Sequence, residues 1–530
     1  MDVLVNQILE HKEAAALPSL LESGGLPALV SGLSAVHRAN LAAALENKLG
    51  LPLVVICPDD TAAESFARDL EAMLGREVDC LIMRDWVFYQ TEAVSRQAEQ
   101  KRLATLYRLA TGQSSIVTAS ISALIQRCMP PETLRQAALV IEDGGSCPPE
   151  KVEEALLRCG YSLTDQVEGP GQFARRGGIL DFFSPGDREP VRIEFWGDDI
   201  DSMGYFDTES QRRSERVEKC TILPAAETLP SLSLGGAEAL AGEIEKLAEK
   251  YARKRSSENA AALAACMRSD AERLRNGLNM SDADRYLPLI YPMASAADYI
   301  PEEAFIFLDQ PGRCAQRAKE YVKQLGEDIK ELQRRGQTAL GAEGFILSPE
   351  TLFKRLEDYP VYMGEAFTVG RNPVAPRTLT SISAKQLPSY AGSAQTAAED
   401  LGQYLKQNYS VVVLSADERR AQVLQSFFKD HGIEALIYRE LKKLPEPGRC
   451  CIAIGSISAG MEYPELRLAV LTDAQLLRRG GEKEAAAPEA ATGPPADRQL
   501  RRPLRGGLCC PREPRHRPLC RHRKDAGGRL

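Results

Sequence analysis

Apolar residues of the kind that build protein cores stop abruptly near the end of this chain. After Val470 there is no Val, Ile, Phe, Tyr, Trp or Met. From Arg478 to Leu530 there are 14 Lys+Arg against 6 Asp+Glu, which leaves 52 of the chain's 66 basic residues and 68 of its 74 acidic residues before Arg478. A body of net charge −16 therefore precedes a tail of net charge +8. Because such a tail cannot bury a core, we expect residues 476–530 to be disordered.

The body is long enough for three or four domains, and its pattern is that of a multidomain α/β protein. In residues 1–135, short apolar runs alternate with amphipathic helices, which predicts a parallel sheet with crossover helices. Short alternating strands over 136–226 predict a small α+β domain inserted into this unit. Residues 227–350 read as the second part of the interrupted unit, and 370–475 read as a further small α/β domain.

The chain carries none of the usual signs of export or membrane insertion. Its N-terminus has no basic stretch followed by an apolar core, and no apolar run approaches the length of a membrane span. The ten cysteines before the tail contain no CxxC and stand singly, apart from Cys450–Cys451. We therefore expect reduced thiols in a cytoplasmic protein without a membrane partner.

A degenerate phosphate-binding loop is found at residues 32–39. Such loops have the pattern GxxxxGK[ST], in which Lys neutralises phosphate and the hydroxyl group holds Mg²⁺. Counting from Gly32, the residues His37, Arg38 and Ala39 stand where Gly, Lys and Ser/Thr belong. Ala39 cannot bind a metal ion, so we interpret this loop as inactive. The alternative is a chance Gly before a helix.

A second degenerate motif ends the buried strand predicted at 304–309. Helicase-type ATPases end this strand in Asp-Glu, with Asp for Mg²⁺ and Glu to activate water. Here the pair is Asp309–Gln310, and Gln310 cannot act as a general base. The two motifs occur in the expected chain order. Together they predict a degenerate helicase-like (RecA-type) module with no catalytic residue, no cofactor and no metal.

The most specific segment of the chain is 170–227. It is similar to a pattern in the bacterial transcription-repair coupling factor family, in the module that this family shares with the excision-repair protein UvrB, and the resemblance extends more thinly over about 20–475. Trp196 stands where the family pattern has Phe. The positions that match the pattern are Phe173, Arg176, Gly177, Asp181, Phe183, Arg192, Phe195, Asp198 and Ile200.

The resemblance implies a function for the module and for the whole protein. Complete members of the family displace RNA polymerase stalled at a DNA lesion, using an ATP- and Mg²⁺-dependent translocase on double-stranded DNA, and they recruit UvrA. The UvrB-like N-terminal part keeps the fold without ATPase activity. In this family, the positions of Arg176, Arg192 and Trp196 contact UvrA. For this chain the resemblance predicts UvrA binding without motor chemistry, since the translocase and the main polymerase- and DNA-binding modules are missing.

Strand alternation gives an independent argument for this surface. In the segment 191–196, Val191, Ile193 and Phe195 point to one face, whereas Arg192, Glu194 and Trp196 point to the other. Trp beside Arg on a face away from the core is typical of a protein-binding hot spot. The alternative from the residues alone is that Trp196 packs under a neighbouring loop and Arg192 pairs with an Asp.

Three interpretations of the tail were compared. A zinc site at Cys509, Cys510, His516, Cys520 and His522 matches no common ligand spacing. A nucleic-acid-binding tail is supported by charge alone. We favour an out-of-frame translation: a back-translation of Asp497–Ala526, shifted by one base, contains the run VGDYVVHENHGIGRY, which resembles the start of the polymerase-interaction module of the family.

A function from a different class remains open at this point. The chain could be an active, UvrB-like, ATP-dependent damage-binding helicase. The residues His37, Arg38, Ala39 and Gln310 argue against it, because each replaces a group that this chemistry needs.

Overall fold

The computed structural model describes residues 1–89, 96–253, 259–278, 280, 282–367, 370, 372–390 and 393–476. The tail predicted over 476–530 lies outside the described residues from 477 onward, and so do its candidate zinc ligands. Among the residues that are described, no helix is both long enough and apolar enough to cross a membrane.

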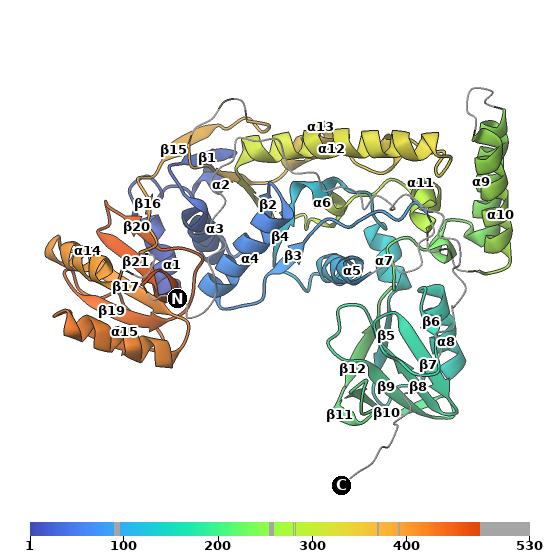
Figure 1. The fold of residues 1–530 in the computed structure, drawn as a ribbon, viewed down its shortest axis with the longest axis horizontal. Coiled ribbons are helices and arrows are strands. Elements are labelled where there is room, and N and C mark those ends of the chain that lie inside the picture. Colours follow the sequence, from blue (N-terminus) through green and yellow to red (C-terminus); the bar gives the residue numbers. More distant parts are fainter. Residues whose placement is uncertain are drawn as a thin grey trace, which may run out of the picture. The chain divides into compact units, whose positions relative to one another are not determined.

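The first sheet has seven strands, all parallel to their neighbours, in the order β15-β1-β14-β13-β2-β4-β3. Every residue of β2 and β13 is buried, as expected for central strands covered on both faces. The α/β class and the parallel sheet predicted from the alternation are thus confirmed (Figure 1). The strands are β1 (Ala28–Ser31), β2 (Leu53–Cys57), β3 (Asp79–Leu81), β4 (Ile116–Ser120), β13 (Phe305–Asp309), β14 (Val361–Gly364) and β15 (Thr378–Ser381).

Helices connect and cover these strands. Strand β4 ends where helix α6 begins, because the Ser120 side chain accepts a hydrogen bond from Ala123 N (3.2 Å) and caps the helix. The helices are α3 (Ala35–Leu49), α4 (Asp60–Leu74), α5 (Gln97–Ala110), α6 (Ile121–Ile125), α7 (Pro131–Ala137), α12 (Pro311–Arg334) and α13 (Pro349–Leu356).

The first sheet extends past the domain boundaries predicted at 350 and 370. It includes β14, and it also includes β15, which lies within the predicted 370–475 domain and pairs with β1 in the register Ala28↔Thr378. Partners so far apart in the chain leave no local pattern, because each parallel strand reads only as a short apolar run.

The insert forms a domain of its own between α7 and the helical region. A six-stranded sheet in the order β11-β10-β9-β8-β7-β6 packs with the pair β12-β5 and with α8 around a common apolar core. Its elements are β5 (Leu139–Glu142), α8 (Pro149–Arg158), β6 (Ser162–Leu163), β7 (Gln172–Arg176), β8 (Ile179–Phe182), β9 (Val191–Trp196), β10 (Asp199–Phe206), β11 (Arg213–Arg216) and β12 (Lys219–Ile222).

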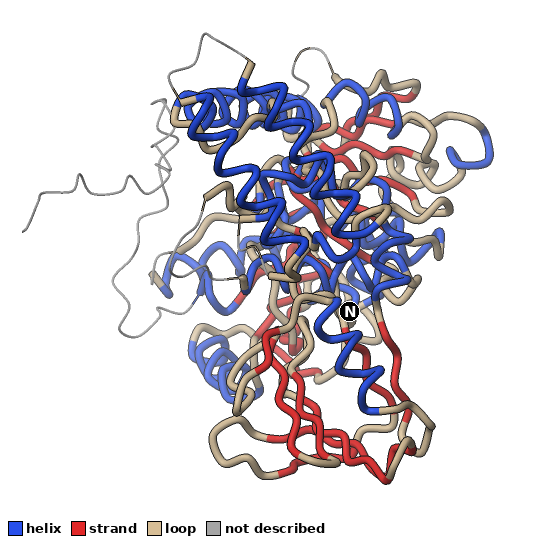
Figure 2. The backbone as a smooth tube through the Cα atoms, turned by 90° about the vertical axis from the view of Figure 1, so that its right-hand side faces the viewer, coloured by secondary structure: helices blue, strands red, loops and turns tan. Residues whose placement is uncertain are grey.

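A mainly helical region follows the insert. Its two long helices, α9 and α10, pack against each other side by side (Figures 1 and 2). The elements are η2 (Pro230–Leu232), α9 (Gly236–Ala252), α10 (Ala260–Arg275), η3 (Ala283–Tyr286), α11 (Leu287–Ile290), η4 (Ala296–Tyr299) and, after α12, η5 (Ala342–Gly344).

The last α/β domain has a six-stranded sheet in the order β16-β20-β21-β17-β19-β18. Helices α14 and α15 pack on one face, and the other face shares a core with α3 and the N-terminal elements. Tyr463 of β20 donates to Asn40 Oδ1 of α3 (2.7 Å). The N-terminal elements are α1 (Asp2–Val5), η1 (Asn6–Glu10) and α2 (Leu20–Ser23). The elements of the domain are β16 (Lys385–Gln386), α14 (Ala394–Lys406), β17 (Ser410–Ser415), α15 (Glu418–Asp430), β18 (Ala435–Tyr438), β19 (Cys450–Ile454), β20 (Met461–Tyr463), β21 (Leu468–Thr472) and α16 (Asp473–Leu476).

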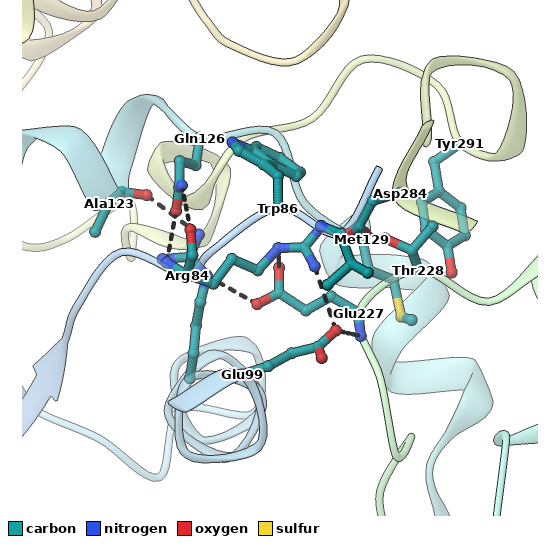
Figure 3. A network of polar contacts seen from close by, with 12 residues as sticks. Arg84, Trp86, Glu99, Ala123, Gln126, Met129, Glu227, Thr228, Asp284 and Tyr291 are labelled. Carbon is teal, nitrogen blue, oxygen red and sulfur yellow. Dashed lines mark hydrogen bonds and ion pairs between the residues drawn. The ribbon is translucent and has the colours of Figure 1, made fainter. Parts of the chain in front are cut away.

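A buried ionic network holds the chain where it leaves the insert. The fully buried carboxylate of Glu227 lies between two guanidinium groups: Arg102 Nε is 2.9 Å from Oε1, and Arg84 Nε is 3.5 Å from Oε2. Arg84 also reaches Glu99 (3.3 Å) and Asp284 (3.0 Å) (Figure 3). The network therefore joins the segment after β3, helix α5, the exit of the insert and η3.

The same network uses backbone groups as well as charges. Glu99 Oε1 accepts the Glu227 backbone N–H (2.7 Å), and Asp284 Oδ2 accepts the Val87 N–H (2.9 Å). Arg84 further donates to Thr228 Oγ1 (3.1 Å) and lies over the Trp86 ring, 4.5 Å from its centroid. Burial raises the pKa of Glu99. The exit of the insert is thus fixed by several directional contacts rather than by apolar packing alone.

We predict that Glu227→Ala strongly destabilises this junction. It leaves the charges of Arg84 and Arg102 buried without their shared partner, a loss that typically costs about 3–5 kcal/mol. The chain has two Trp residues, so in a Trp196→Phe background the fluorescence of Trp86 reports the network during urea unfolding. The exposed Glu209→Ala serves as the control, and equal unfolding midpoints for the two variants would contradict the assignment.

Candidate functional site

The degenerate phosphate loop has the backbone course of a strand–turn–helix. Gly32 follows β1 with φ +86°, and α3 begins three residues later at Ala35. A Cβ on Gly32 would lie 2.2 Å from the carbonyl oxygen of Ile382, so glycine is required at this turn. The sequence-predicted loop therefore exists as a turn, and its side chains decide what it can bind.

Arg38 forms a buried ion pair with Asp309 of the second predicted motif. Its Nε donates to Asp309 Oδ1, and its Nη1 donates to the Leu33 carbonyl (2.8 Å). Both side chains of the Arg38–Asp309 pair are almost completely buried, at 5% and 3% exposure. A Cβ at Gly364 would lie 2.9 Å from Arg38 Cδ, which shows how closely the backbone packs around the pair. The structure thus brings the two predicted motifs together and joins them by the Arg38–Asp309 ion pair.

Of the other predicted residues, His37 and Ala39 lie in the core, whereas Gln310 stays beside the pair and its Nε2 donates to Asp309 Oδ2 (3.4 Å). The buried His37 ring contacts Tyr463 edge-on (5.0 Å between centroids), and its Nδ1 lies 2.7 Å from Ser34 Oγ. Burial lowers the pKa of His37 to about 4, so the ring is neutral at pH 7. Ala39 is buried in the core. Gln310 has φ 52° before α12, and its Oε1 accepts a hydrogen bond from Arg313 (2.9 Å).

We predict that Arg38→Ala destabilises the first sheet by about 3–5 kcal/mol, because Asp309 keeps a buried charge without a partner. The double variant Arg38→Met/Asp309→Leu removes both charges and should recover most of this loss. Unfolding in urea, followed by circular dichroism, measures both effects, with the exposed Arg313→Ala as the control. A double variant as unstable as Arg38→Ala would show that the pair does not act as a charge-compensated unit.

The second predicted site is the outer face of the insert sheet. Along β9, Val191 and Ile193 are fully buried, and Arg192 and Glu194 are partly buried on the opposite face. Trp196 ends the strand on that same outer face with 83% of its surface exposed. The tight turn after it places Gly197 at φ 64° and pairs Trp196 with Asp199 of β10. Nothing in the described structure packs over the indole ring.

The side chain of Arg192 is held in place by contacts within the insert sheet. It lies opposite Asp181 of β8, and its Nε and Nη2 donate to the two carboxylate oxygens of that residue (2.7 and 2.8 Å). Its guanidinium also lies over the Phe206 ring, 4.6 Å from the centroid. The hydrogen bond with Asp181 raises the pKa of Arg192. The alternative considered from sequence is therefore right about Arg192 and wrong about Trp196.

Arg176 completes the predicted trio on the same face. It is exposed, and its Nη2 donates to the Asp165 carbonyl (2.6 Å). Arg176 lies opposite Ile179 of β8, which lies opposite Glu194 of β9. Ile179 is 36% exposed, so an apolar side chain stands between a basic and an acidic one in a row across three strands.

Ile179 and Glu194 were not selected from the sequence. Glu194 is held by Ser202 Oγ (2.9 Å) and lies 3.7 Å from Arg213. The signal was available, because the alternation that places Leu180 and Phe182 in the core sends Ile179 and Asp181 to the outer face. What was missing was the register, which alone shows that Ile179 is next to Arg176 and Glu194.

No metal centre is found within the described part of the chain, where no group of three His, Cys, Asp or Glu residues is placed to hold an ion. The ten cysteines in this part are free thiols. The outer face offers an exposed indole ring, two guanidinium groups and one exposed aliphatic side chain.

Comparisons with known proteins agree with this geometry. Residues 139–227, which include the whole insert sheet, match the family described as UvrB interaction domain. The chain is 28% identical over 497 residues to the transcription-repair-coupling factor of Bacillus subtilis, covering 91% of this chain and 41% of that protein. The chain carries the N-terminal region of a transcription-repair coupling factor.

Other coupling factors show the same extent of similarity. The protein of Staphylococcus aureus (strain USA300) is 24% identical over 91% of this chain and 41% of its own length. That of Haemophilus influenzae is 27% identical over 80% of this chain and 36% of its own length. The chain thus spans about two fifths of the length of these curated relatives.

Proposed function

We propose that the chain binds UvrA through the outer face of the insert sheet. The observation that carries the proposal is Trp196, a large aromatic side chain with 83% of its surface exposed on a face shared with Arg192 and Arg176. Trp and Arg dominate the energetics of protein–protein interfaces, and an exposed apolar group rimmed by charge marks such interfaces.

The two arginines have different roles in this proposal. Arg176 forms no ion pair among the described residues, so its guanidinium is available for a carboxylate on UvrA. Arg192 is already bound to Asp181 and packed on Phe206, so it contributes a rigid, oriented cation beside the indole ring. Rigid groups lose little entropy on binding. Arg192 therefore stabilises the face as well as contacting the partner.

We further propose that this chain neither needs a cofactor nor hydrolyses ATP. Arg38 and Asp309 are bound to each other rather than free for phosphate and metal, and Gln310 has no carboxylate to activate water. These observations disfavour the active UvrB-like helicase. Displacement of RNA polymerase and ATP-driven movement on double-stranded DNA are assigned to the complete coupling factor.

We also propose that the chain is cytoplasmic, because free thiols are typical of proteins in that reducing compartment.

Titration of purified UvrA with the chain tests the binding face. We expect Trp196→Ala and Arg176→Ala to weaken binding by at least about 2 kcal/mol each, roughly thirtyfold. Matched controls are Phe367→Ala, an equally exposed aromatic residue elsewhere (79%), and Arg175→Ala, which lies on the opposite face of β7 and pairs with Glu150 and Glu153. Arg192→Ala should also lower the melting temperature, whereas Arg176→Ala should not. Wild-type affinity in folded Trp196→Ala and Arg176→Ala would refute the face.

Titration with a fluorescent ATP analogue and Mg²⁺ tests the second proposal. We expect no saturable binding of the analogue and no phosphate release above a blank without protein. The reason is that the Arg38 side chain stands in the way of a phosphate group and neutralises the charge of Asp309. Hydrolysis by the wild-type chain that Asp309→Asn abolishes would show that the site is catalytic after all.

A further inference from the structure

A groove far along the chain from the insert lies between α12 and the segment from η5 to the first turn of α13. Its volume is about 510 Å³, within the usual range for binding pockets, about 300–1,000 Å³. Its apolar side chains are buried or half-buried and are called the floor, and its charged side chains are exposed and are called the rim. The lining residues are Lys319, Val322, Lys323, Ala342, Glu343, Ile346, Ser348, Pro349 and Glu350.

The charges at the rim are segregated by wall. Lys319 and Lys323 are one turn apart on α12, whereas Glu343 and Glu350 belong to η5 and α13 on the other side. Within the described residues, Lys319, Glu343 and Glu350 form no ion pair, and Lys323 lies 4.0 Å from Glu327 of its own helix. The two walls do not neutralise each other. Each therefore keeps its charge available for a molecule that enters the groove.

The floor and the walls together select one class of occupant. Nucleic acid is disfavoured because two carboxylates face the groove and would repel phosphates. The charged side chains are long and exposed, which suits the rim of a protein interface rather than an enclosed small-molecule site. The apolar floor of Val322, Ala342 and Ile346 offers burial to the side chains of a chain segment.

We propose that this groove docks a peptide segment of a partner protein. The segment carries one or two apolar side chains for the floor, an acidic residue for Lys319 and Lys323, and a basic residue for Glu343 and Glu350. Because opposite charges stand on opposite walls, the groove accepts the segment in one orientation and rejects the reverse. The surface is built from elements other than those of the proposed UvrA-binding face.

Selection from a random 12-residue peptide library displayed on phage, with the full chain as bait, tests this inference. We expect enriched peptides to combine an apolar residue with an acidic and a basic residue on opposite sides. A synthetic peptide with an enriched sequence should bind the charge-reversed variant Lys319→Glu/Glu343→Lys at least tenfold more weakly than it binds the wild-type chain. Selection on that variant should enrich peptides with the reversed order of charges. Glu350 is left unchanged because it also complements the dipole of α13.

A matched control and a second variant keep the test decisive. Lys330→Glu/Glu302→Lys makes the same charge changes at exposed positions outside the groove and should bind the synthetic peptide like wild type. Ala342→Trp fills the floor and should abolish binding, with circular dichroism reporting the fold. The inference fails if no peptide is enriched, or if the enriched peptides bind wild type and charge-reversed chain equally well.

Discussion

The carboxylate of Glu227 is the point on which the arrangement of this chain depends. It is the last residue of the segment that matches the UvrB interaction domain, and it is buried between Arg84 and Arg102 from the first part of the chain. A charge in such a place is tolerated only when its partners are present. The exit of the insert is therefore anchored by these ion pairs together with the hydrogen bonds of Glu99 and Thr228. The outer face of the insert can carry exposed functional residues because the insert's attachment requires none of them.

The Arg38–Asp309 pair contains a second buried carboxylate whose charge is compensated by a guanidinium group. In an active nucleotide-binding site, the lysine binds phosphate and the aspartate binds the metal ion, and both side chains remain solvated in the absence of these ligands. Here the longer, planar guanidinium reaches across the turn and satisfies Asp309 itself, and the Leu33 carbonyl takes a second donor. His37 and Ala39 join the core. The Arg38 guanidinium thus serves as an internal counter-ion for the buried carboxylate of Asp309.

Local patterns predicted the parts of this structure that depend on neighbours in the chain. Alternation in β9 placed Trp196 and Arg192 on the outer face. The inactivity inferred from the two degenerate motifs stays a prediction. Partners across strands could not be predicted, because the pairing of Asp181 with Arg192 depends on the register of β8 against β9. The same limit hid Ile179 beside Arg176, and the membership of β15 in the first sheet.

The position of β1 in its sheet has a consequence for synthesis on the ribosome. Both neighbours of β1, the strands β14 and β15, come from residues 361–364 and 378–381. At about 5–20 residues per second, β1 waits tens of seconds for them, with its edges unpaired. The insert, from β5 to β12, finds all its strand partners within itself. The insert sheet that bears Trp196 is therefore complete while the first sheet still lacks β13, β14 and β15.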